Sequence, residues 1–558
     1  MNAMPPVQKN DVLELPIHGL TADGRGVGRM GGYAIFVQGA LPGETVRCHV
    51  IKANRGYGVA KLLQVLTSSP HRQAPACPAY ARCGGCALQH MTYAAQLEAK
   101  RAQVQDALQR LGGFDGLAVE PVLGMETPWH YRNKGSFPAG IGQDGVAIGF
   151  FAPHSHRLVP LEDCLIQDPR VMGAALAIRD WARQWDVPAY DEATGQGTLR
   201  HAMARASEAG VLAVVITAGP LPHQDALVDL LRQRVPGLIG VVHNRNDADS
   251  NVILGPAYVT LWGEARLPVS ICGLDFSVSA ASFLQVNPVQ TQRLYETALS
   301  MLELQGKETV LDVYCGIGTI SLLLARHAKK VIGIESVQPA VEDAARNAEV
   351  NGIQNAQFLC GLAETLLPQL VQQGLRPDAM VIDPPRKGCD PAALQAILAS
   401  GVPRLIYISC DPATLARDCK ILAQGGLYPQ QVQPVDMFPH TGHVETVVLL
   451  SHKKPDGHIN VKVEFGEGEG KVPLDNIAKR AEEYKPKERV TYKMIKEYIE
   501  AKYGFKVHTA YIAEVKRDLG LPMYDAPNAV EELKQPRKHP TPEKVEAIKD
   551  ALKHFEVI

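Results

Sequence analysis

Cys410 is the residue whose type and position most directly indicate chemistry. It follows the apolar run LIYIS, which predicts a buried parallel strand, and precedes the turn-forming pair Asp411-Pro412, after which a helix is expected from Thr414. Ligands bind at the carboxyl ends of strands in open α/β sheets, so a cysteine there is a candidate nucleophile. A free cysteine that only packs in the core is the alternative.

A glycine turn and a distant acid indicate a nucleotide-like cofactor. In ETVLDVYCGIGTISLLL a strand is followed by Gly316 and Gly318, which let the backbone approach a ligand closely. Glu335 ends the next predicted strand, 19 residues after Gly316, where doubly wound folds bind ribose hydroxyls. The third glycine of the dinucleotide fingerprint is absent. The motif resembles the first motif of S-adenosylmethionine-dependent methyltransferases, so that cofactor is expected.

Polar residues lie beside the termini of two more predicted strands. Asp383 follows PDAMVI and opens the sequence DPPR, whose prolines give a stiff exit that could present the carboxylate to a base edge or to the cofactor. His443 and Glu445 come just before TVVLL, which is expected to be the last strand of the sheet.

Cysteine spacing indicates a metal centre. Cys77, Cys83 and Cys86 have the spacing C-x5-C-x2-C, and three thiolates this close can hold one centre once a fourth ligand completes it. Cys164, after a polar loop, is the natural candidate. Zinc and an iron–sulfur cluster both fit soft thiolates, and chance clustering is the alternative. Eleven cysteines, an odd number, indicate a reducing compartment rather than a disulfide scaffold.

Composition sets the broad class. The 558 residues predict about three to four domains, and 46% hydrophobic with 21% charged residues is ordinary for a globular protein. No apolar run approaches the roughly 18 residues of a membrane span, and the N-terminus has no apolar leader, so a cytoplasmic protein without a membrane partner is expected. Residues 453–558 contain 17 Lys and 4 Arg, against 10 Lys and 26 Arg before them, which marks a separate module.

Four domains are predicted along the chain. Runs of alternating apolar and polar residues over residues 8–67 favour a small five-stranded, OB-like β-barrel that resembles a TRAM domain. Residues 1–75 contain eight Lys and Arg against four Asp and Glu, so this domain is either a nucleic-acid binder or an ordinary β-domain. Residues 68–265 are expected to form a mixed α/β domain with the metal cluster, and residues 266–452 a Rossmann-like methyltransferase domain. Candidate RNA contacts in the central domain are Arg132, Asn133, Lys134, Arg200 and Arg205.

The tail is predicted as a linker, residues 453–475, and a helical module, residues 476–558. Two amphipathic helices around His508-Thr509 and a closing helix capped at Thr541 favour a helix-turn-helix or winged-helix unit. A protein-interaction module is equally compatible. The residues that could contact RNA are Lys506, Lys516 and Arg517.

Motifs in one order carry a family resemblance: C-x5-C-G-G-C, F-x-Q-x-N at Phe283, Gln285 and Asn287, then LDVYCGIGT, IDPPRKG, ISCDPATLARD and GHVETV. Over about residues 8–452 the chain resembles bacterial RNA 5-methyluridine methyltransferases, in particular the TRAM-bearing branch with an iron–sulfur cluster that modifies 23S ribosomal RNA. The resemblance implies that Cys410 is the nucleophile and Glu445 the base. It also implies S-adenosylmethionine binding by Gln285, Tyr314, Glu335 and Asp383, and a [4Fe–4S] cluster on Cys77, Cys83, Cys86 and Cys164.

The implied reaction methylates C5 of a uridine in RNA through a covalent Cys–C6 adduct. The thiol would need a lowered pKa, which the helix after Pro412 could favour through its dipole. The target base would have to leave its stack. Some relatives have Asn where this chain has Thr319. A monomer acting on 23S ribosomal RNA is expected; a tRNA uracil-C5 methyltransferase and a non-catalytic RNA-binding protein with a relic pocket are the alternatives.

Overall fold

The computed structural model describes residues 6–452, 492–519 and 540–555. The chain forms two compact units, residues 1–456 and 457–558. The finer division of the first unit into barrel, central and methyltransferase domains stays a prediction. Within the described residues, no helix has both the length and the apolar character needed to cross a membrane.

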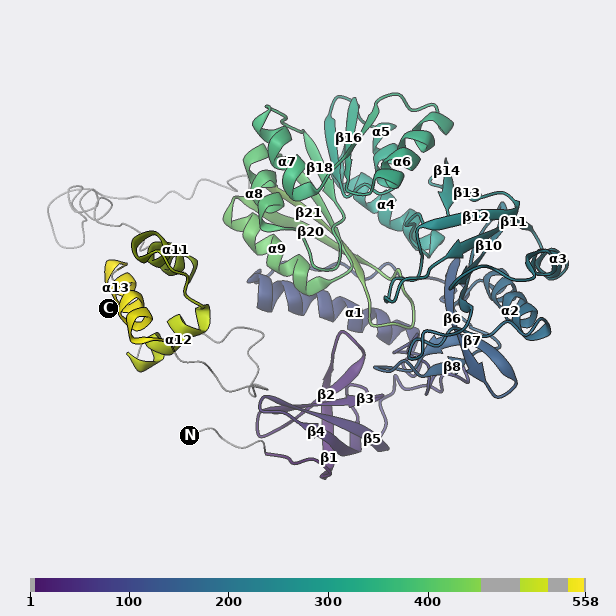
Figure 1. Ribbon diagram of the computed structural model, residues 1–558, viewed down its shortest axis with the longest axis horizontal. Coiled ribbons are helices and arrows are strands. Elements are labelled where there is room, and N and C mark those ends of the chain that lie inside the picture. The colour runs from purple at the N-terminus through teal and green to yellow at the C-terminus, as the bar shows by residue number, and fades with distance from the viewer. Residues whose placement is uncertain (1–5, 453–491, 520–539, 556–558) are drawn as a thin grey trace. The chain divides into compact units, whose positions relative to one another are not determined.

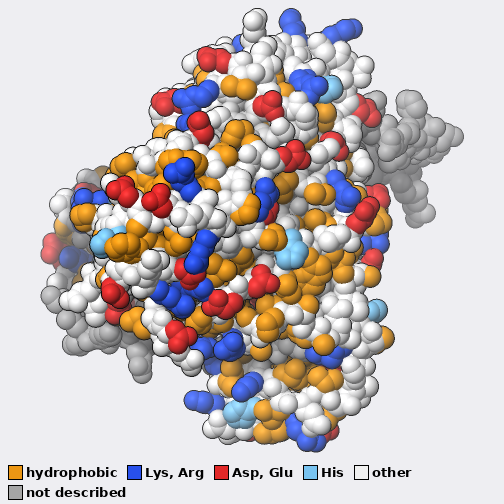
Figure 2. Space-filling view, turned by 90° about the vertical axis from the view of Figure 1, so that its right-hand side faces the viewer, with side chains coloured by type: hydrophobic (Ala, Val, Ile, Leu, Met, Phe, Trp, Pro, Cys, Tyr) orange, Lys and Arg blue, Asp and Glu red, His pale blue; other side chains and the backbone are white. Residues whose placement is uncertain are grey.

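Five strands close into a barrel at the start of the first unit, in the order β1-β2-β3-β5-β4 (Figure 1). Alternate residues point inward, and Gly28 is required because a Cβ there would lie 2.4 Å from the Leu15 side chain. Figure 2 shows basic side chains beside apolar ones over the lower part of one face, where the barrel lies. The predicted five-stranded barrel is confirmed. Its strands are Val12–Leu20, Arg25–Met30, Tyr33–Gln38, Thr45–Ala53 and Tyr57–Thr67.

Helix α1 (Tyr93–Ala107) and a π-helical turn (Leu108–Gly112) follow residues 77–88, here called the cysteine loop. A seven-stranded sheet comes next, in the order β12-β11-β10-β9-β6-β7-β8, with only β10 and β11 parallel. Helices α2 (Pro169–Gln184) and α3 (Gln224–Arg234) supply its apolar cover. The strands are β6 Lys134–Gly142, β7 Gly145–Phe151, β8 Leu158–Pro160, β9 Leu199–Ser207, β10 Gly210–Thr217, β11 Leu238–Arg245 and β12 Ala257–Gly263.

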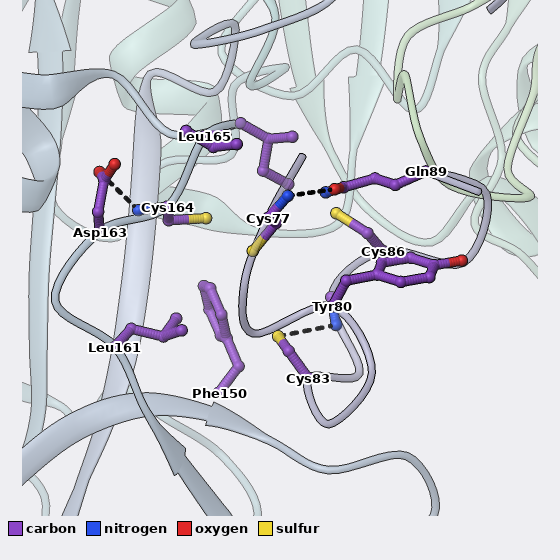
Figure 3. Close-up of a pocket in the computed structure, with 12 residues that line it drawn as sticks. Cys77, Tyr80, Cys83, Cys86, Gln89, Phe150, Leu161, Asp163, Cys164 and Leu165 are labelled. Carbon is purple, nitrogen blue, oxygen red and sulfur yellow. Dashed lines mark hydrogen bonds between the residues drawn. The ribbon is translucent and has the colours of Figure 1, made fainter. Parts of the chain in front are cut away.

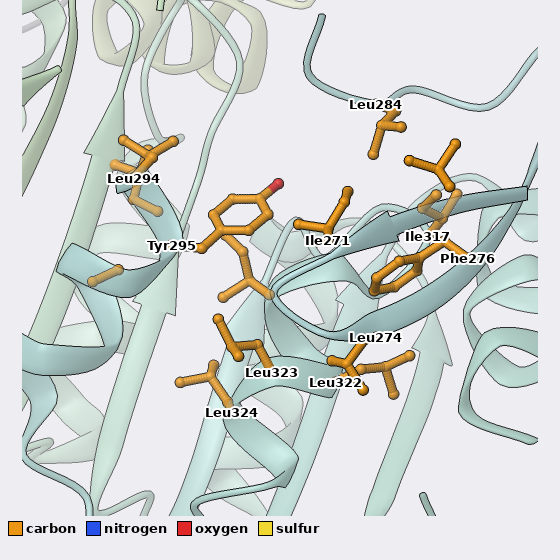
Figure 4. Packing of buried hydrophobic residues seen from close by; sticks show 14 of the residues in the cluster. Ile271, Leu274, Phe276, Leu284, Leu294, Tyr295, Ile317, Leu322, Leu323 and Leu324 are labelled. Atoms are coloured by element: carbon orange, nitrogen blue, oxygen red, sulfur yellow. The ribbon is translucent and has the colours of Figure 1, made fainter. Parts of the chain in front are cut away.

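A hairpin, β13 (Arg266–Ile271) and β14 (Leu274–Ser279), leads into the predicted methyltransferase domain. Its apolar side chains pack with those of helices α4 (Pro288–Leu302) and α5 (Thr319–Ala325), as Figure 4 shows for Phe276, Tyr295 and Leu323. This core fixes the segment between the hairpin and α4, which carries Gln285.

A second seven-stranded sheet has the order β17-β16-β15-β18-β19-β21-β20. β17, β16, β15, β18 and β19 are parallel, and β21 runs antiparallel between β19 and β20. The start of β21 therefore lies at the same edge as the carboxyl ends of the parallel strands. The strands are β15 Thr309–Val313, β16 Lys330–Glu335, β17 Ala356–Cys360, β18 Ala379–Ile382, β19 Arg404–Ser409, β20 Leu427–Val435 and β21 Glu445–His452. The further helices are α6 Gln338–Val350, α7 Ala363–Gln372, α8 Pro391–Ser400 and α9 Pro412–Gln424.

Helix α9 begins two residues earlier than predicted. Asp411 is its N-cap and accepts hydrogen bonds from the backbone N–H groups of Ala413 at 2.9 Å and Thr414 at 3.0 Å. Pro412 takes the first helical position, where its missing N–H costs nothing. The cap thus brings the helix N-terminus directly behind Cys410.

The second unit contains three described helices, α11 (Tyr492–Tyr503), α12 (Thr509–Asp518) and α13 (Pro542–His554). Their apolar faces share a small core. Thr541 occupies the N-cap position of α13 as predicted, but its side chain makes no capping hydrogen bond. The predicted linker, residues 453–475, and the side chain of Arg517 lie outside the described part, and the helix-turn-helix assignment stays a prediction.

Candidate active site

One pocket of about 590 Å³ brings together the six residues expected to act or to bind cofactor. This volume is ordinary for a pocket that holds a cofactor-sized ligand. The pocket opens at the carboxyl edge of the second sheet, where β15, β16, β18 and β19 end and β21 begins. The six residues are Gln285, Tyr314, Glu335, Asp383, Cys410 and Glu445.

The glycine turn after β15 shapes one wall of this pocket. Tyr314 and Gly316 both have positive φ, 71° and 56°, so the chain turns sharply at the strand end. Glu335 accepts hydrogen bonds from the backbone N–H of Gly316 at 3.1 Å and of Val337 at 2.9 Å. Its carboxylate is therefore oriented at the pocket wall, the position from which such an acid binds ribose hydroxyls.

Thr319, where the family pattern varies, begins helix α5. Its hydroxyl lies 3.1 Å from the hydroxyl of Tyr295, a side chain of the buried core. The residue therefore braces the glycine turn from behind and does not line the pocket.

The Cys410 thiol has a pKa raised to about 11 by burial and by the nearby carboxyl groups of Glu445 and Asp383, with Arg386 acting in the opposite direction. The expectation of a lowered pKa is therefore wrong for the protein without ligands. Desolvation of the thiolate outweighs the opposite effect of the Arg386 guanidinium. In this state Cys410 is a neutral thiol near neutral pH.

Two carboxyl groups beside this thiol hold their protons near neutral pH. Burial raises the pKa of Glu445, which is 3% exposed, to about 8, and the carboxyl of Asp383 adds to this effect. Burial and Asp312 raise the pKa of Asp383 to about 7. A base whose pKa lies near the working pH can both accept and release a proton efficiently.

Asp418 holds the loop that carries Asp383 and Arg386, a role that sequence reasoning missed. Its buried carboxylate accepts hydrogen bonds from the backbone N–H of Cys389 at 2.8 Å and from the Tyr407 hydroxyl at 2.7 Å. A buried acid on the apolar face of the predicted helix was the available signal, because such a group needs partners.

Residues 436–443, here called the strap, connect β20 to β21 and end two residues before Glu445. Within the strap, Phe438 lines the pocket. The buried Lys100 ammonium of α1 donates to the Asp436 carboxylate at 2.5 Å and to the Phe438 carbonyl at 3.0 Å. The Tyr93 hydroxyl donates to Asp436 at 2.8 Å. Helix α1 thus positions a pocket residue.

The cysteine loop also contacts the strap. The backbone N–H groups of Ala87 and Leu88, next to Cys86, both donate to the His440 carbonyl at 2.9 Å. His440 has a φ of 66° and stacks on Trp129 with ring centroids 3.8 Å apart. The strap conformation therefore depends on groups from the region expected to bind metal.

The barrel contacts the strap as well. A Cβ on Gly442 would lie 2.0 Å from the Ala22 carbonyl oxygen, so only glycine allows this approach. Gly24, in the same barrel turn, has a φ of 80°, and a Cβ there would meet that of Ala87 at 3.0 Å. The barrel, the cysteine loop and the strap thus meet at one place.

The four cysteines expected to bind metal line a single smaller cavity, and Figure 3 shows their sulfur atoms directed into it. Burial and the neighbouring thiols raise the pKa of Cys86 to about 12 and of Cys164 to about 11. Four free cysteine thiols around one space are the type of donor that binds an iron–sulfur cluster, but the structure does not show the predicted cluster site. In the part of the chain that the structure describes, no three His, Cys, Asp or Glu side chains have the geometry to hold a metal ion. The cysteines are Cys77, Cys83, Cys86 and Cys164.

The fold and this pocket define a Rossmann-like methyltransferase that carries an added β-barrel. Residues 247–453 match the family model of tRNA (uracil-5-)-methyltransferases, and residues 6–63 match the TRAM domain. An RNA methyltransferase of Halalkalibacterium halodurans is 46% identical over 451 residues, 80% of this chain and 98% of that protein. One of Clostridium tetani is 43% identical over 450 residues, with the same shares covered.

The chain belongs to the RNA (uracil-5-)-methyltransferase family and is an S-adenosylmethionine-dependent enzyme. Among solved structures, the tRNA (uracil-54, C5)-methyltransferase of Pyrococcus abyssi in complex with S-adenosyl-L-homocysteine is similar, with a TM-score of 0.63 and 26% identity. That match covers 78% of this chain and 100% of the archaeal chain.

Proposed function

We propose that this enzyme methylates C5 of a uridine in 23S ribosomal RNA, with Cys410 as nucleophile and Glu445 as base. The observation that supports this most is that a cysteine and a buried carboxyl group with a raised pKa line one pocket with the cofactor residues. Uracil C5 is a weak nucleophile, and C5 chemistry requires this pair of groups. A cofactor site alone would support any methyl transfer.

The proposed roles follow the geometry. Bound S-adenosylmethionine supplies an electrophilic methyl group on a sulfonium. Gln285, Tyr314, Glu335 and Asp383 bind and orient this donor from the walls that they line. The Cys410 thiol releases its proton to solvent as its sulfur bonds to C6 of the uracil, and the C5–C6 electron pair becomes available at C5.

Electrons and protons balance in the steps that follow. C5 takes the methyl group and forms the new carbon–carbon bond, and the donor leaves as S-adenosylhomocysteine. Glu445, in its ionised form, then removes the C5 proton, and the electrons of the C–H bond restore the C5–C6 double bond as the bond from C6 to sulfur breaks. The released Cys410 thiolate takes a proton back from solvent. A pKa of about 8 for Glu445 suits a group that must accept this proton and release it before the next turnover.

We propose further that Cys77, Cys83, Cys86 and Cys164 hold a [4Fe–4S] cluster with a structural role. Four free thiols around one cavity support this assignment, as does the loop's contact with the strap through Ala87 and Leu88. The cluster would cross-link two segments that are distant in sequence, because Cys164 lies in a different loop from the other three cysteines. The cluster takes part in no redox step.

A second candidate substrate is tRNA. The Pyrococcus abyssi enzyme is named for uracil-54 of tRNA, and the family model carries a tRNA name. Residues around Cys410 and Glu445 would do the same chemistry on either RNA. The choice therefore depends on how the barrel and the central sheet hold the nucleic acid.

Transfer of tritiated methyl from S-adenosylmethionine to unmodified 23S ribosomal RNA and to unmodified tRNA tests the proposal. Label is expected at C5 of uridine in ribosomal RNA. Cys410→Ala should abolish transfer yet keep S-adenosylhomocysteine affinity, with Cys360→Ala, an exposed cysteine, as control. Label only in tRNA would overturn the choice of RNA, and full activity of Cys410→Ala would overturn the mechanism.

A further inference from the structure

Three cations lie together where the central sheet meets the wall of the active-site pocket. Lys134 begins β6 and pairs directly with Arg205 on the neighbouring strand β9, so both side chains project from the same face. Arg132 lies two residues before Lys134, and its guanidinium carbon is 5.9 Å from the centroid of the Phe438 ring. Phe438 lines the pocket.

The backbone fixes this cluster against the cofactor wall. The Asn133 N–H donates to the Val286 carbonyl at 2.8 Å, and an Arg205 guanidinium N–H donates to the Ser282 carbonyl. Ser282 and Val286 flank the segment that holds Phe283 and Gln285 in the pocket. The cations are therefore next to the site at which a target base would enter.

Nothing in the described protein neutralises these charges. None of the three side chains forms an ion pair with a carboxylate among residues 6–452, and the groups that act on Lys134 are the two arginines. Arg205 is 3% exposed, and its Nε atom has no hydrogen-bond partner. Burial with both cations lowers the pKa of Lys134 to about 7. A buried, unpaired cation is costly unless an anion completes the site.

We propose that Arg132, Lys134 and Arg205 bind one backbone phosphate of the RNA, beside the uridine that enters the pocket; this rests on the proposed function. A phosphodiester has the charge and the several acceptor oxygens that two guanidinium forks and an ammonium require. S-Adenosylmethionine has no phosphate, and its carboxylate is the other anion that could reach this place. The experiment separates the two.

Lys134→Met in the full-length protein tests the site, with Lys330→Met as the matched control. Lys330 is exposed at the amino end of β16, on the opposite edge of the sheet. For Lys134→Met, KM for 23S ribosomal RNA should rise about tenfold with kcat unchanged. The slope of log K against log salt for RNA binding should become shallower by about 0.7 to 0.9, the change expected for one lost phosphate contact.

A measurement of thermal stability distinguishes a phosphate-binding role of Lys134 from a purely structural one. Because Lys134→Met removes an unpaired charge, the melting temperature of the free protein should stay the same or rise while RNA affinity falls. If that variant is insoluble, Arg132→Gln is measured in the same way. An unchanged salt slope and KM would overturn the proposal.

Weaker S-adenosylhomocysteine binding with an unchanged RNA salt slope would overturn it too, because the cations would then serve the cofactor carboxylate. The salt dependence of RNA binding is measured without catalysis. The absence of any methyl transfer by the parent enzyme would therefore count against the proposed function and leave this test intact.

Discussion

Replacing Glu445 by Gln should stabilise the folded protein at alkaline pH while it blocks turnover. The ordinary pKa of a glutamic acid is 4.5, and burial with the adjacent Asp383 raises that of Glu445 to about 8. Between these values the folded state keeps a proton that the unfolded state has lost. The free energy of unfolding of the parent protein therefore falls as the pH rises from about 4.5 to about 8.

The size of this effect follows from the two pKa values. Their difference corresponds to roughly 5 kcal/mol at full ionisation, an upper value because Asp383 titrates in the same range. Glutamine has the shape of the protonated acid and no charge. Glu445→Gln should thus match the parent protein near pH 5 and become several kcal/mol more stable by pH 8 to 9.

The assay is chemical unfolding of both proteins at pH 5, 7 and 9, with Glu349→Gln, an exposed position on α6, as control. The same variant, given S-adenosylmethionine and 23S ribosomal RNA, should accumulate a protein–RNA adduct that survives denaturing gels, because the C5 proton has no acceptor. Turnover should fall by about 10² to 10⁴. A stability difference that is constant with pH, or normal turnover without adduct, would refute the reasoning.

Two further predictions concern groups that hold the active site in place, the Lys100–Asp436 ion pair and the four cysteines. Lys100→Met should destabilise the first unit by about 3 to 5 kcal/mol in chemical unfolding, because it leaves the buried Asp436 carboxylate without its cation. The double variant Lys100→Met with Asp436→Leu should recover much of the lost stability. No recovery would show that the ion pair is not the cause of the loss. Protein purified without oxygen should contain about four irons per chain and show a broad visible absorption, and Cys86→Ser should lose both. Cys48→Ser, the control, should keep the metal content of the parent protein. One zinc per chain in the parent protein and in this control would contradict the cluster assignment.

Much of the site could be predicted because it depends on strand ends. Apolar runs followed by Gly316, Asp383 and Cys410 indicated a parallel sheet with polar groups at one edge, and the structure places those residues in one pocket. Glu445 could be included only through the family resemblance, because the antiparallel insertion of β21 between two other strands is a long-range arrangement that local pattern does not reveal.

The supports of the site could not be predicted, since they come from segments distant in sequence. Lys100 is one of two adjacent cations in a helix of mixed charge, and only the fold shows that it is buried against Asp436, 336 residues later. The pKa of Cys410 was expected in the wrong direction because a helix dipole is visible in sequence, whereas burial and facing carboxyl groups are not.

The meeting of the barrel, the cysteine loop and the strap has a consequence for how the enzyme is made. Gln96 and His440 are hydrogen-bonded across 344 positions, and Ala22 approaches Gly442 across a still longer separation. During synthesis the barrel and the cysteine loop leave the ribosome long before the strap exists, so the contacts that order Phe438 and the approach to Glu445 must be among the last to form. A nascent chain would therefore contain the barrel and the glycine turn well before it could methylate anything.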